Sequence, residues 1–409
     1  MRGIDSSSAS GGTTSISGTV YAPNGTLPLY NVIVYVPNGE LKPLTKGVTC
    51  DRCGTVASGD PLVTALTDAK GTFKLENMPV GKDIPLVLQL GKWRRKVTIP
   101  EVKSCVDTKL TDGTMMRLPK NRTEGDLPLV AVTTGVADKV PCMLPKIGID
   151  SSEFGPGGAG KPFEFYNGAQ LSGFTEGKGP TGSPDVRVLW DNLETLKKYD
   201  MVIISCEGYE AASPKPTSGW PVTKDATSFK AMTDYLAAGG RIFTTDYEYT
   251  WYKYSPDPAL AAVGVIPGGA PGGPNPIDLD VSFPKGKALA DWLQVVEPTS
   301  PYGKVTCDYV FDNVSSVTAA AQTWARSGPP HPRFFTINTP VGKPAEAQCG
   351  KAVHLDAHIN MSDHVSETFP SGCTTPLKQG EKAFAFFLFD LASCIQKEGD
   401  APKPPPPIK

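Results

Sequence analysis

The sequence lacks any run of about 18 apolar residues, the length that a membrane-spanning helix requires. It also lacks an excess of charge of one sign, because 40 Lys and Arg residues nearly balance 42 Asp and Glu residues. This balance excludes binding to nucleic acid by bulk electrostatic attraction. Histidine is scarce, with four residues in the chain. We therefore expect no transmembrane span, no nucleic-acid partner and few sites for an imidazole base or ligand.

A signal peptide is also missing, since the first residues lead directly into a polar stretch of Ser and Gly. The chain nevertheless contains nine cysteines, which favour an oxidising compartment. We therefore expect an extracellular or outer cell-surface protein, lipid-anchored before processing, whose export signal has been removed from this numbering. Residues 1–14 would then be a flexible leader.

The hydrophobic pattern changes once along the chain, which predicts two domains and a tail. Residues 15–120 contain short alternating stretches separated by Gly, Pro and Asn, as is typical of a small β-sandwich. Residues 126–398 alternate buried strands with amphipathic helices and predict an α/β domain. Residues 399–409 are proline-rich and should be extended.

The α/β region is organised around residues 199–249. Within it, residues 201–204 predict a buried strand, residues 228–238 a helix that two glycines end, and residues 241–245 a second buried strand. A strand, a crossover helix and a strand predict a parallel pair, and ligands bind at the carboxyl ends of such strands. Four polar side chains follow these two strands: Cys206, Glu207, Asp246 and Glu248.

The first region also carries recognisable phrases. They lie at residues 17–20, 31–34, 67–73 and 78–81. Together they resemble the carboxypeptidase regulatory-like domain, and the resemblance covers roughly residues 15–100. It implies a transthyretin-like sandwich that serves as an accessory domain, carbohydrate-binding in some members, with no chemistry of its own.

The second region resembles the class I glutamine amidotransferase-like, or trehalose-utilisation-like, superfamily. The resemblance rests on residues 199–200 before a buried strand, residues 238–241 at the end of a helix, and a late strand that ends in His358. It implies a flavodoxin-type three-layer α/β domain. Amidotransferases of this superfamily place a nucleophilic Cys after the strand that follows the helix, a position near Asp246 that holds no Cys here. The resemblance therefore implies a catalytically degenerate domain.

The chain as a whole resembles a group of uncharacterised secreted proteins of myxobacterial type. The shared phrases lie at residues 80–86, 91–95, 146–150, 205–208 and 369–373. This resemblance implies a fold and a location outside the cell, and it implies no activity.

Cys206 and His358 are the best candidates for nucleophilic catalysis, because a thiol nucleophile needs an adjacent base. Asp246 is a further catalytic candidate at the neighbouring strand end. The alternative interpretation is that Cys206 is a disulfide partner or a buried thiol.

A metal site is the second chemical alternative. His354, Asp356 and His358 alternate along one predicted strand and would point to one face, and two His with a carboxylate can hold a divalent metal. However, a strand buried on both faces must pair its polar side chains inside the protein. We therefore expect no bound metal and no other cofactor.

Cys50 and Cys53 form a lone C-x-x-C in a loop rich in Gly and Thr. A structural zinc site needs about four ligands, and no second C-x-x-C is present. We therefore predict a local disulfide between these two cysteines. Among the others, pairing of Cys349 with Cys373 or Cys394 is plausible, and the remaining connectivity stays open.

The leading hypothesis is a non-enzymatic exported protein with a binding or structural assembly role at the cell surface. Its partner would be a protein or a polysaccharide, and self-assembly is open. The first alternative is a surface hydrolase that uses either Cys206 with His358 or a metal on His354, Asp356 and His358. The second alternative is a carbohydrate-binding accessory protein, which depends on analogy for the first domain.

Overall fold

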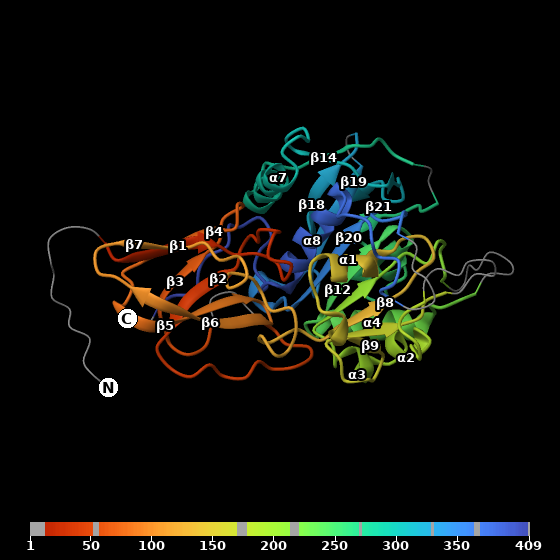
Figure 1. Ribbon diagram of the computed structural model, residues 1–409. Coiled ribbons are helices and arrows are strands. Elements are labelled where there is room, and N and C mark those ends of the chain that lie inside the picture. The colour runs from red at the N-terminus through yellow and green to blue at the C-terminus, as the bar shows by residue number, and fades with distance from the viewer. Residues whose placement is uncertain are drawn as a thin grey trace.

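The computed structural model describes residues 13–51, 57–169, 178–212, 221–269, 272–328, 331–363 and 369–407. The expected leader, residues 1–14, lies almost wholly outside the described residues, and so does Cys53. The described chain is rich in β-structure, with several sheets and helices. Its first strands form a compact region on one side of the molecule, and the helices lie in or beside the second region (Figure 1).

The first region consists of two small sheets. One has the strand order β4-β1-β7 and the other β3-β2-β5-β6. The strands are β1 (Ser15–Thr19), β2 (Ile33–Pro37), β3 (Pro61–Leu66), β4 (Thr72–Glu76), β5 (Gly81–Leu90), β6 (Trp93–Val102) and β7 (Asp107–Leu110). Alternate side chains of β2 face opposite ways, with Val34 and Val36 in the main core and Ile33 and Tyr35 in a smaller cluster. The predicted short alternating strands are therefore present.

The second region contains a ten-stranded sheet with the order β15-β14-β18-β19-β20-β12-β11-β8-β10-β9. The strands from β20 to β9 in this order are parallel to their neighbours. They are β8 (Val130–Thr133), β9 (Phe154–Pro156), β10 (Phe163–Tyr166), β11 (Met201–Ile204), β12 (Arg241–Thr245) and β20 (Gly350–Leu355). The others are antiparallel: β14 (Ile277–Leu279), β15 (Lys304–Val305), β18 (Ala321–Arg326) and β19 (Pro332–Thr339).

Two long helices cover the two faces of the parallel strands. Met201 and Ile203 of β11 face the cluster that contains α8 (Gln379–Ala392), whereas Val202 and Ile204 face the cluster that contains α4 (Ala226–Ala237). Strand β11 pairs in parallel with β12 after the α4 crossover, as the sequence predicts.

Helix α8 is buried nearly all round, because it lies between the sheet and the first region (Figure 1). Its Phe384 packs on Phe243 of the sheet, with ring centroids 3.8 Å apart. On the other side, Phe386 stacks on Tyr30 of the first region at 5.6 Å. One continuous hydrophobic cluster therefore joins both regions through α8. Gly91 marks the close approach, since a Cβ there would lie 1.9 Å from the carbonyl oxygen of Ala392.

The remaining elements are short, apart from α7 (Pro284–Val296), which packs on α8. The helices are α1 (Met143–Lys146), α2 (Arg187–Trp190), α3 (Leu193–Leu196), α5 (Thr250–Lys253), α6 (Pro258–Ala261), η1 (Val140–Cys142), η2 (Ser151–Glu153), η3 (Asp246–Tyr249) and η4 (Ala345–Ala347). Two further strand pairs are β13 (Gly264–Val265) with β17 (Ser316–Val317) and β16 (Tyr309–Val310) with β21 (Ala357–His358). Within the described ranges, no helix has the length and apolar character needed to cross a membrane.

The disulfides correct the sequence prediction. Cys50 is bonded to Cys349, at a sequence separation of 299, so the predicted bond between Cys50 and Cys53 is wrong. A second bond joins Cys142 to Cys373. Because Cys349 is bonded to Cys50, the pairing of Cys349 with Cys373 or Cys394 is also wrong. The fold brings the first-region loop against the start of β20, a proximity that local spacing cannot indicate.

The proline-rich tail lies against the first region rather than away from the protein (Figure 1). Thr64 of β3 donates a hydrogen bond to the carbonyl of Pro405 at 2.6 Å, and Pro405 is buried. The tail therefore contributes to covering one face of the small β3-β2-β5-β6 sheet.

Candidate functional site

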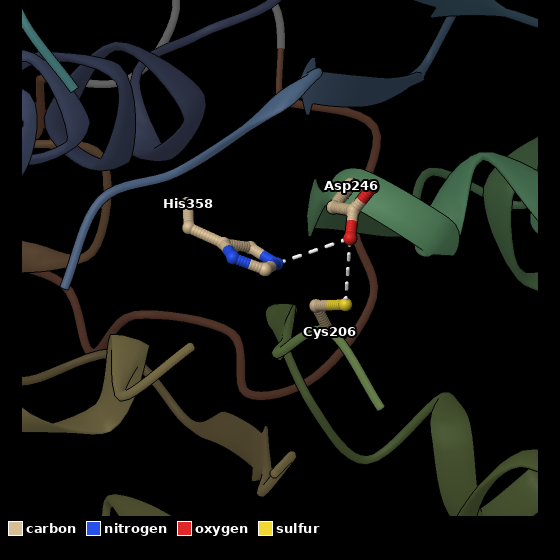
Figure 2. Close-up of side chains that lie close together, drawn as sticks. All are labelled: Cys206, Asp246 and His358. Carbon is tan, nitrogen blue, oxygen red and sulfur yellow. Dashed lines mark hydrogen bonds and ion pairs between the residues drawn. The ribbon is translucent and has the colours of Figure 1, made fainter. Parts of the chain in front are cut away.

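The carboxyl ends of β11 and β12 meet the short strand β21 and bring three polar side chains together. Figure 2 shows the thiol of Cys206 and the imidazole of His358 directed at the same carboxylate, that of Asp246. The Cys206 Sγ and the His358 Nε2 lie 3.1 and 3.0 Å from Asp246 Oδ2. Both Cys206 and Asp246 are fully buried, and His358 is 5% exposed. We name these three residues the Asp246 cluster.

The backbone at Asp246 is unusual. Its φ is +43°, in the left-handed region that residues other than Gly rarely adopt. It lies where β12 ends and η3 begins, and its side chain is held by hydrogen bonds from both sides. Such strained conformations persist where the surroundings fix them, and they concentrate at functional sites.

A polar layer orients Asp246. Asn313 donates through Nδ2 to Asp246 Oδ1 and to Asp356 Oδ1, at 2.8 Å in each case. The other oxygen of Asp356 accepts from the backbone N–H of Asn313 at 2.9 Å and lies 3.4 Å from Arg333. Because Asn313 occupies Oδ1 of Asp246, the carboxylate presents Oδ2 to the thiol and the imidazole.

The protonation of the cluster follows from burial and charge. Burial, with the nearby charges of Asp246 and Glu248, raises the pKa of the Cys206 thiol well above its usual range. Burial opposes a charge on His358, but the hydrogen bond to Asp246 and the charge of Asp138 raise its pKa on balance. The thiol therefore donates a hydrogen bond to Asp246. The Nε2 atom of His358 is hydrogen-bonded to Asp246 rather than to Cys206. This arrangement disfavours a thiolate nucleophile activated by His358.

A second buried group, the Lys224 cluster, adjoins the first. Lys224 lies 2.7 Å from Glu207 and 2.9 Å from Glu248, and all three side chains are fully buried. The Lys224 Nζ also lies 5.4 and 5.5 Å from the ring centroids of Trp190 and Trp251. Glu207 and Glu248 are the next and next-but-one residues after Cys206 and Asp246. The segment after each of the strands β11 and β12 therefore contributes one side chain to the Asp246 cluster and one to the Lys224 cluster.

In the Lys224 cluster, burial and charge act in opposite directions on the pKa values. Burial lowers the pKa of Lys224, but its two carboxylate partners more than offset this and raise it. Burial raises the pKa of Glu248 to about 7 despite the lysine.

The alternative metal set predicted from the sequence does not converge. Strand β20 ends at Leu355, and β21 pairs with β16 instead of continuing the ladder, so the alternation across His354, Asp356 and His358 is broken. His354 lies between Tyr252 and Phe335, and Thr244 Oγ1 is 3.0 Å from its Nδ1. Burial lowers the pKa of His354 to about 3. In the part of the chain that the structure describes, the ligand atoms that do gather, within 4.8 Å of one another, are those of Cys206, Asp246 and His358.

Sequence reasoning placed Cys206, Asp246 and His358 correctly at the carboxyl edge and missed their supporting residues. Asn313 lies in a loop between short strands, and Lys224 lies in the connection from β11 to α4. Neither belongs to a motif with fixed spacing. One signal in the sequence could have indicated a buried ion pair. It is the isolated Lys224, which stands just before the helix cap Asp225 and downstream of the Cys206–Glu207 turn.

Comparison with known proteins yields no family. No family model matches the chain, and no curated protein matches it. Two similar solved structures are type II cohesin–X-dockerin complexes from Acetivibrio cellulolyticus. They are 14% and 13% identical, cover 30% and 37% of this chain and 76% and 88% of those chains, and have TM-scores of 0.17 and 0.18.

A third similar structure is a cytoplasmic protein from Salmonella typhimurium. It is 12% identical, covers 66% of this chain and 100% of that chain, and has a TM-score of 0.33. At these scores none of the three structures supports an assignment of fold family or function.

Proposed function

We propose that this chain is an exported, non-enzymatic protein with a binding or structural assembly role at the cell surface. In this proposal a transthyretin-like sandwich is joined to a catalytically degenerate, flavodoxin-type α/β domain. The observation that carries it is the state of the Asp246 cluster. The thiol is fully buried and donates to the Asp246 carboxylate, and burial with the charges of Asp246 and Glu248 raises its pKa and so disfavours the thiolate.

The strand order supports the flavodoxin-type interpretation. When the short edge strand β9 is left aside, the parallel strands β8, β10, β11, β12 and β20, numbered in chain order, are arranged as 2-1-3-4-5 across the sheet. This is the order of flavodoxin-like sheets, whose ligand site lies at the carboxyl ends of the strands. The site residues of this chain lie at that edge. The resemblance places the nucleophilic Cys of the superfamily near Asp246, where this chain has no Cys.

The joined core supports a structural role. Helix α8 serves the sheet and the first region at once, and the bond between Cys50 and Cys349 connects them covalently. A sandwich held in this way presents a fixed surface to a protein or polysaccharide partner. The disulfides are compatible with an extracellular address.

Thiol labelling tests the proposal. In the folded full-length protein, iodoacetamide should modify the exposed Cys105 and leave the buried Cys206 and Cys307 unmodified until the chain is unfolded. Peptide mass spectrometry gives the modified fraction at each cysteine. Rapid alkylation of Cys206 in the native protein, accompanied by loss of a hydrolytic activity, would replace this proposal by the hydrolase. Labelling of intact cells with a membrane-impermeant reagent tests the address.

One observation favours the surface hydrolase as the second candidate. Asp246 carries a strained backbone at a strand-to-helix turn, as nucleophiles of several hydrolases do. A panel of ester, amide and glycoside substrates, with Asp246→Asn as the control, distinguishes the two. Turnover that the variant abolishes would establish an enzyme.

A further inference from the structure

We propose that Cys206, Asp246 and His358 bind one divalent ion of the zinc type. The three side chains offer a sulfur, an oxygen and a nitrogen atom, the ligand set that Zn²⁺ prefers in proteins. Their ligand atoms all lie within 4.8 Å of one another. Cys206 and Asp246 follow β11 and β12 of the central sheet, and His358 ends β21, which pairs with β16, so three separate elements present the ligand atoms (Figure 2).

The spacing fits a tetrahedral ion after a small expansion. Bonds of about 2.0–2.3 Å at tetrahedral angles place nitrogen and oxygen about 3.4 Å apart and sulfur and oxygen about 3.6 Å apart. In the structure the corresponding separations from Asp246 Oδ2 are 3.0 Å to His358 Nε2 and 3.1 Å to Cys206 Sγ. Each of these two pairs therefore widens by about 0.5 Å on binding.

Outer contacts of the kind that metal ligands need are present for Asp246 and Cys206, whereas His358 Nδ1 has no hydrogen-bond partner among the described residues. Asn313 donates to Asp246 Oδ1 and leaves Oδ2 for the ion. The backbone N–H of Gly208 donates to Cys206 Sγ at 3.2 Å, a contact that favours the thiolate. Asn313 Oδ1 is buried and has no hydrogen-bond partner among the described residues. It can therefore accept a hydrogen bond from a buried water molecule.

Binding can occur without a change in the charge of the cluster. When His358 starts as the imidazolium, the ion takes the place of one proton on Cys206 Sγ and one on His358 Nε2. Both protons leave to solvent, so two positive charges replace two. Bonds from the three ligands to the ion thus replace the hydrogen bonds that hold the Asp246 cluster together when no ion is bound.

This site departs from the expectation of no cofactor, and it differs from the set of His354, Asp356 and His358. It does not depend on the proposed non-enzymatic role, because a buried ion can stabilise a protein that has no activity. The two proposals therefore fail separately, since metal content and thiol labelling are different measurements.

The test uses the full-length chain produced in an oxidising compartment, unfolded with its disulfides intact and refolded with Zn²⁺ or Co²⁺. After gel filtration, elemental analysis should give about one equivalent of ion per chain. The cobalt form should show a thiolate-to-cobalt charge-transfer band. Protein refolded with a chelator should melt at a lower temperature than the zinc form.

Variants identify the ligands. Cys206→Ser should abolish the charge-transfer band, and His358→Gln should lower the bound ion several-fold. Cys307→Ser is the matched control, because Cys307 is also a buried free thiol but lies outside the cluster. If Cys206→Ser fails to fold, the wild-type cobalt spectrum and His358→Gln still decide the question. Folded wild-type protein without stoichiometric ion, or loss of the band in Cys307→Ser instead, would overturn the proposal.

Discussion

The two edges of the central sheet each bury a group of charges, but the groups are built differently. At the amino edge, Lys285 and Lys351 both contact Asp390 and Glu398, so each carboxylate meets two lysines. At the carboxyl edge, Lys224 alone serves two glutamates. The two lysines at the amino edge therefore balance the two carboxylates, and each carboxylate has a second lysine partner. The two glutamates of the Lys224 cluster, in contrast, depend on one lysine.

The imbalance extends around the carboxyl edge. Among the described residues around the Asp246 and Lys224 clusters, five carboxyl groups are buried against three cationic side chains and the imidazole of His358. The carboxyl groups are those of Asp138, Glu207, Asp246, Glu248 and Asp356, and the cations are Lys139, Lys224 and Arg333. Burial raises the pKa of Asp356 to about 7 and that of Asp138 to about 6. Shifts of this kind concentrate at sites where a protein binds or reacts, which agrees with the position of the candidate site at this edge.

The largest expected effect is that of Lys224→Met. Removing the lysine leaves the buried carboxylates of Glu207 and Glu248 facing each other without a cation. Breaking a buried ion pair in this way costs about 3–5 kcal/mol of the free energy of unfolding. Urea denaturation at neutral pH measures the loss, which should shrink in acid as Glu248, whose pKa is raised by burial, takes up a proton. A loss below about 1 kcal/mol would show that the edge does not depend on this lysine.

The sequence predicted the architecture better than the contacts between its parts. The buried strands 201–204 and 241–245 and the helix between them were predictable because apolar runs, glycine stops and short spacing are local signals. The contacts of helix α8 with both regions were not predictable from local signals. A helix that is apolar all round must be covered on both sides, and here the first region supplies the second cover.

The site shows the same limit. Strand ends indicated Cys206 and Asp246, because ligand sites follow parallel strands. The set of His354, Asp356 and His358 failed because a break after Leu355 ends the alternation on which it relied. The bond between Cys50 and Cys349 spans 299 positions, and only the folded chain brings the two thiols together.

Removal of a disulfide should lower the free energy of unfolding by a similar amount at either edge. The comparison therefore separates the contribution of chain entropy from that of charge. Cys50→Ala with Cys349→Ala opens the bond at the amino edge, and Cys142→Ala with Cys373→Ala opens the one at the carboxyl edge. Each double variant should lose about 2–5 kcal/mol, because each bond closes a long loop in the unfolded chain. Denaturation under non-reducing conditions compares them. A much larger loss at one edge would mean that the bond there holds a local structure together.

The two edges should respond oppositely to pH. The folded-state pKa of Asp138 is about 6, above its usual value, chiefly because of burial. Its contribution to stability is therefore complete below about pH 4 and is lost as the pH rises through 6, by up to about 3 kcal/mol. Asp390 at the amino edge has a lowered pKa, because its two lysines outweigh burial, and its contribution is lost as the pH falls.

Asp138→Asn tests the carboxyl-edge half of this contrast. The variant cannot titrate at this position, so its stability relative to wild type should rise between pH 4 and 7. Denaturation midpoints across that range measure the difference. Parallel curves for the two proteins would contradict the assigned role of Asp138.

The smallest effect is expected at the amino edge, from Lys351→Met. Lys285 remains in contact with both Asp390 and Glu398, so neither carboxylate is left without a cation. The loss should be about 1–3 kcal/mol, the cost of a buried group that keeps part of its hydrogen bonding. Lys287→Met is the control, because Lys287 lies on the same helix as Lys285 but is exposed, and it should leave the denaturation midpoint unchanged. If Lys351→Met instead costs as much as Lys224→Met, redundancy does not protect the amino edge, and the contrast between the edges must come from their charge balance alone.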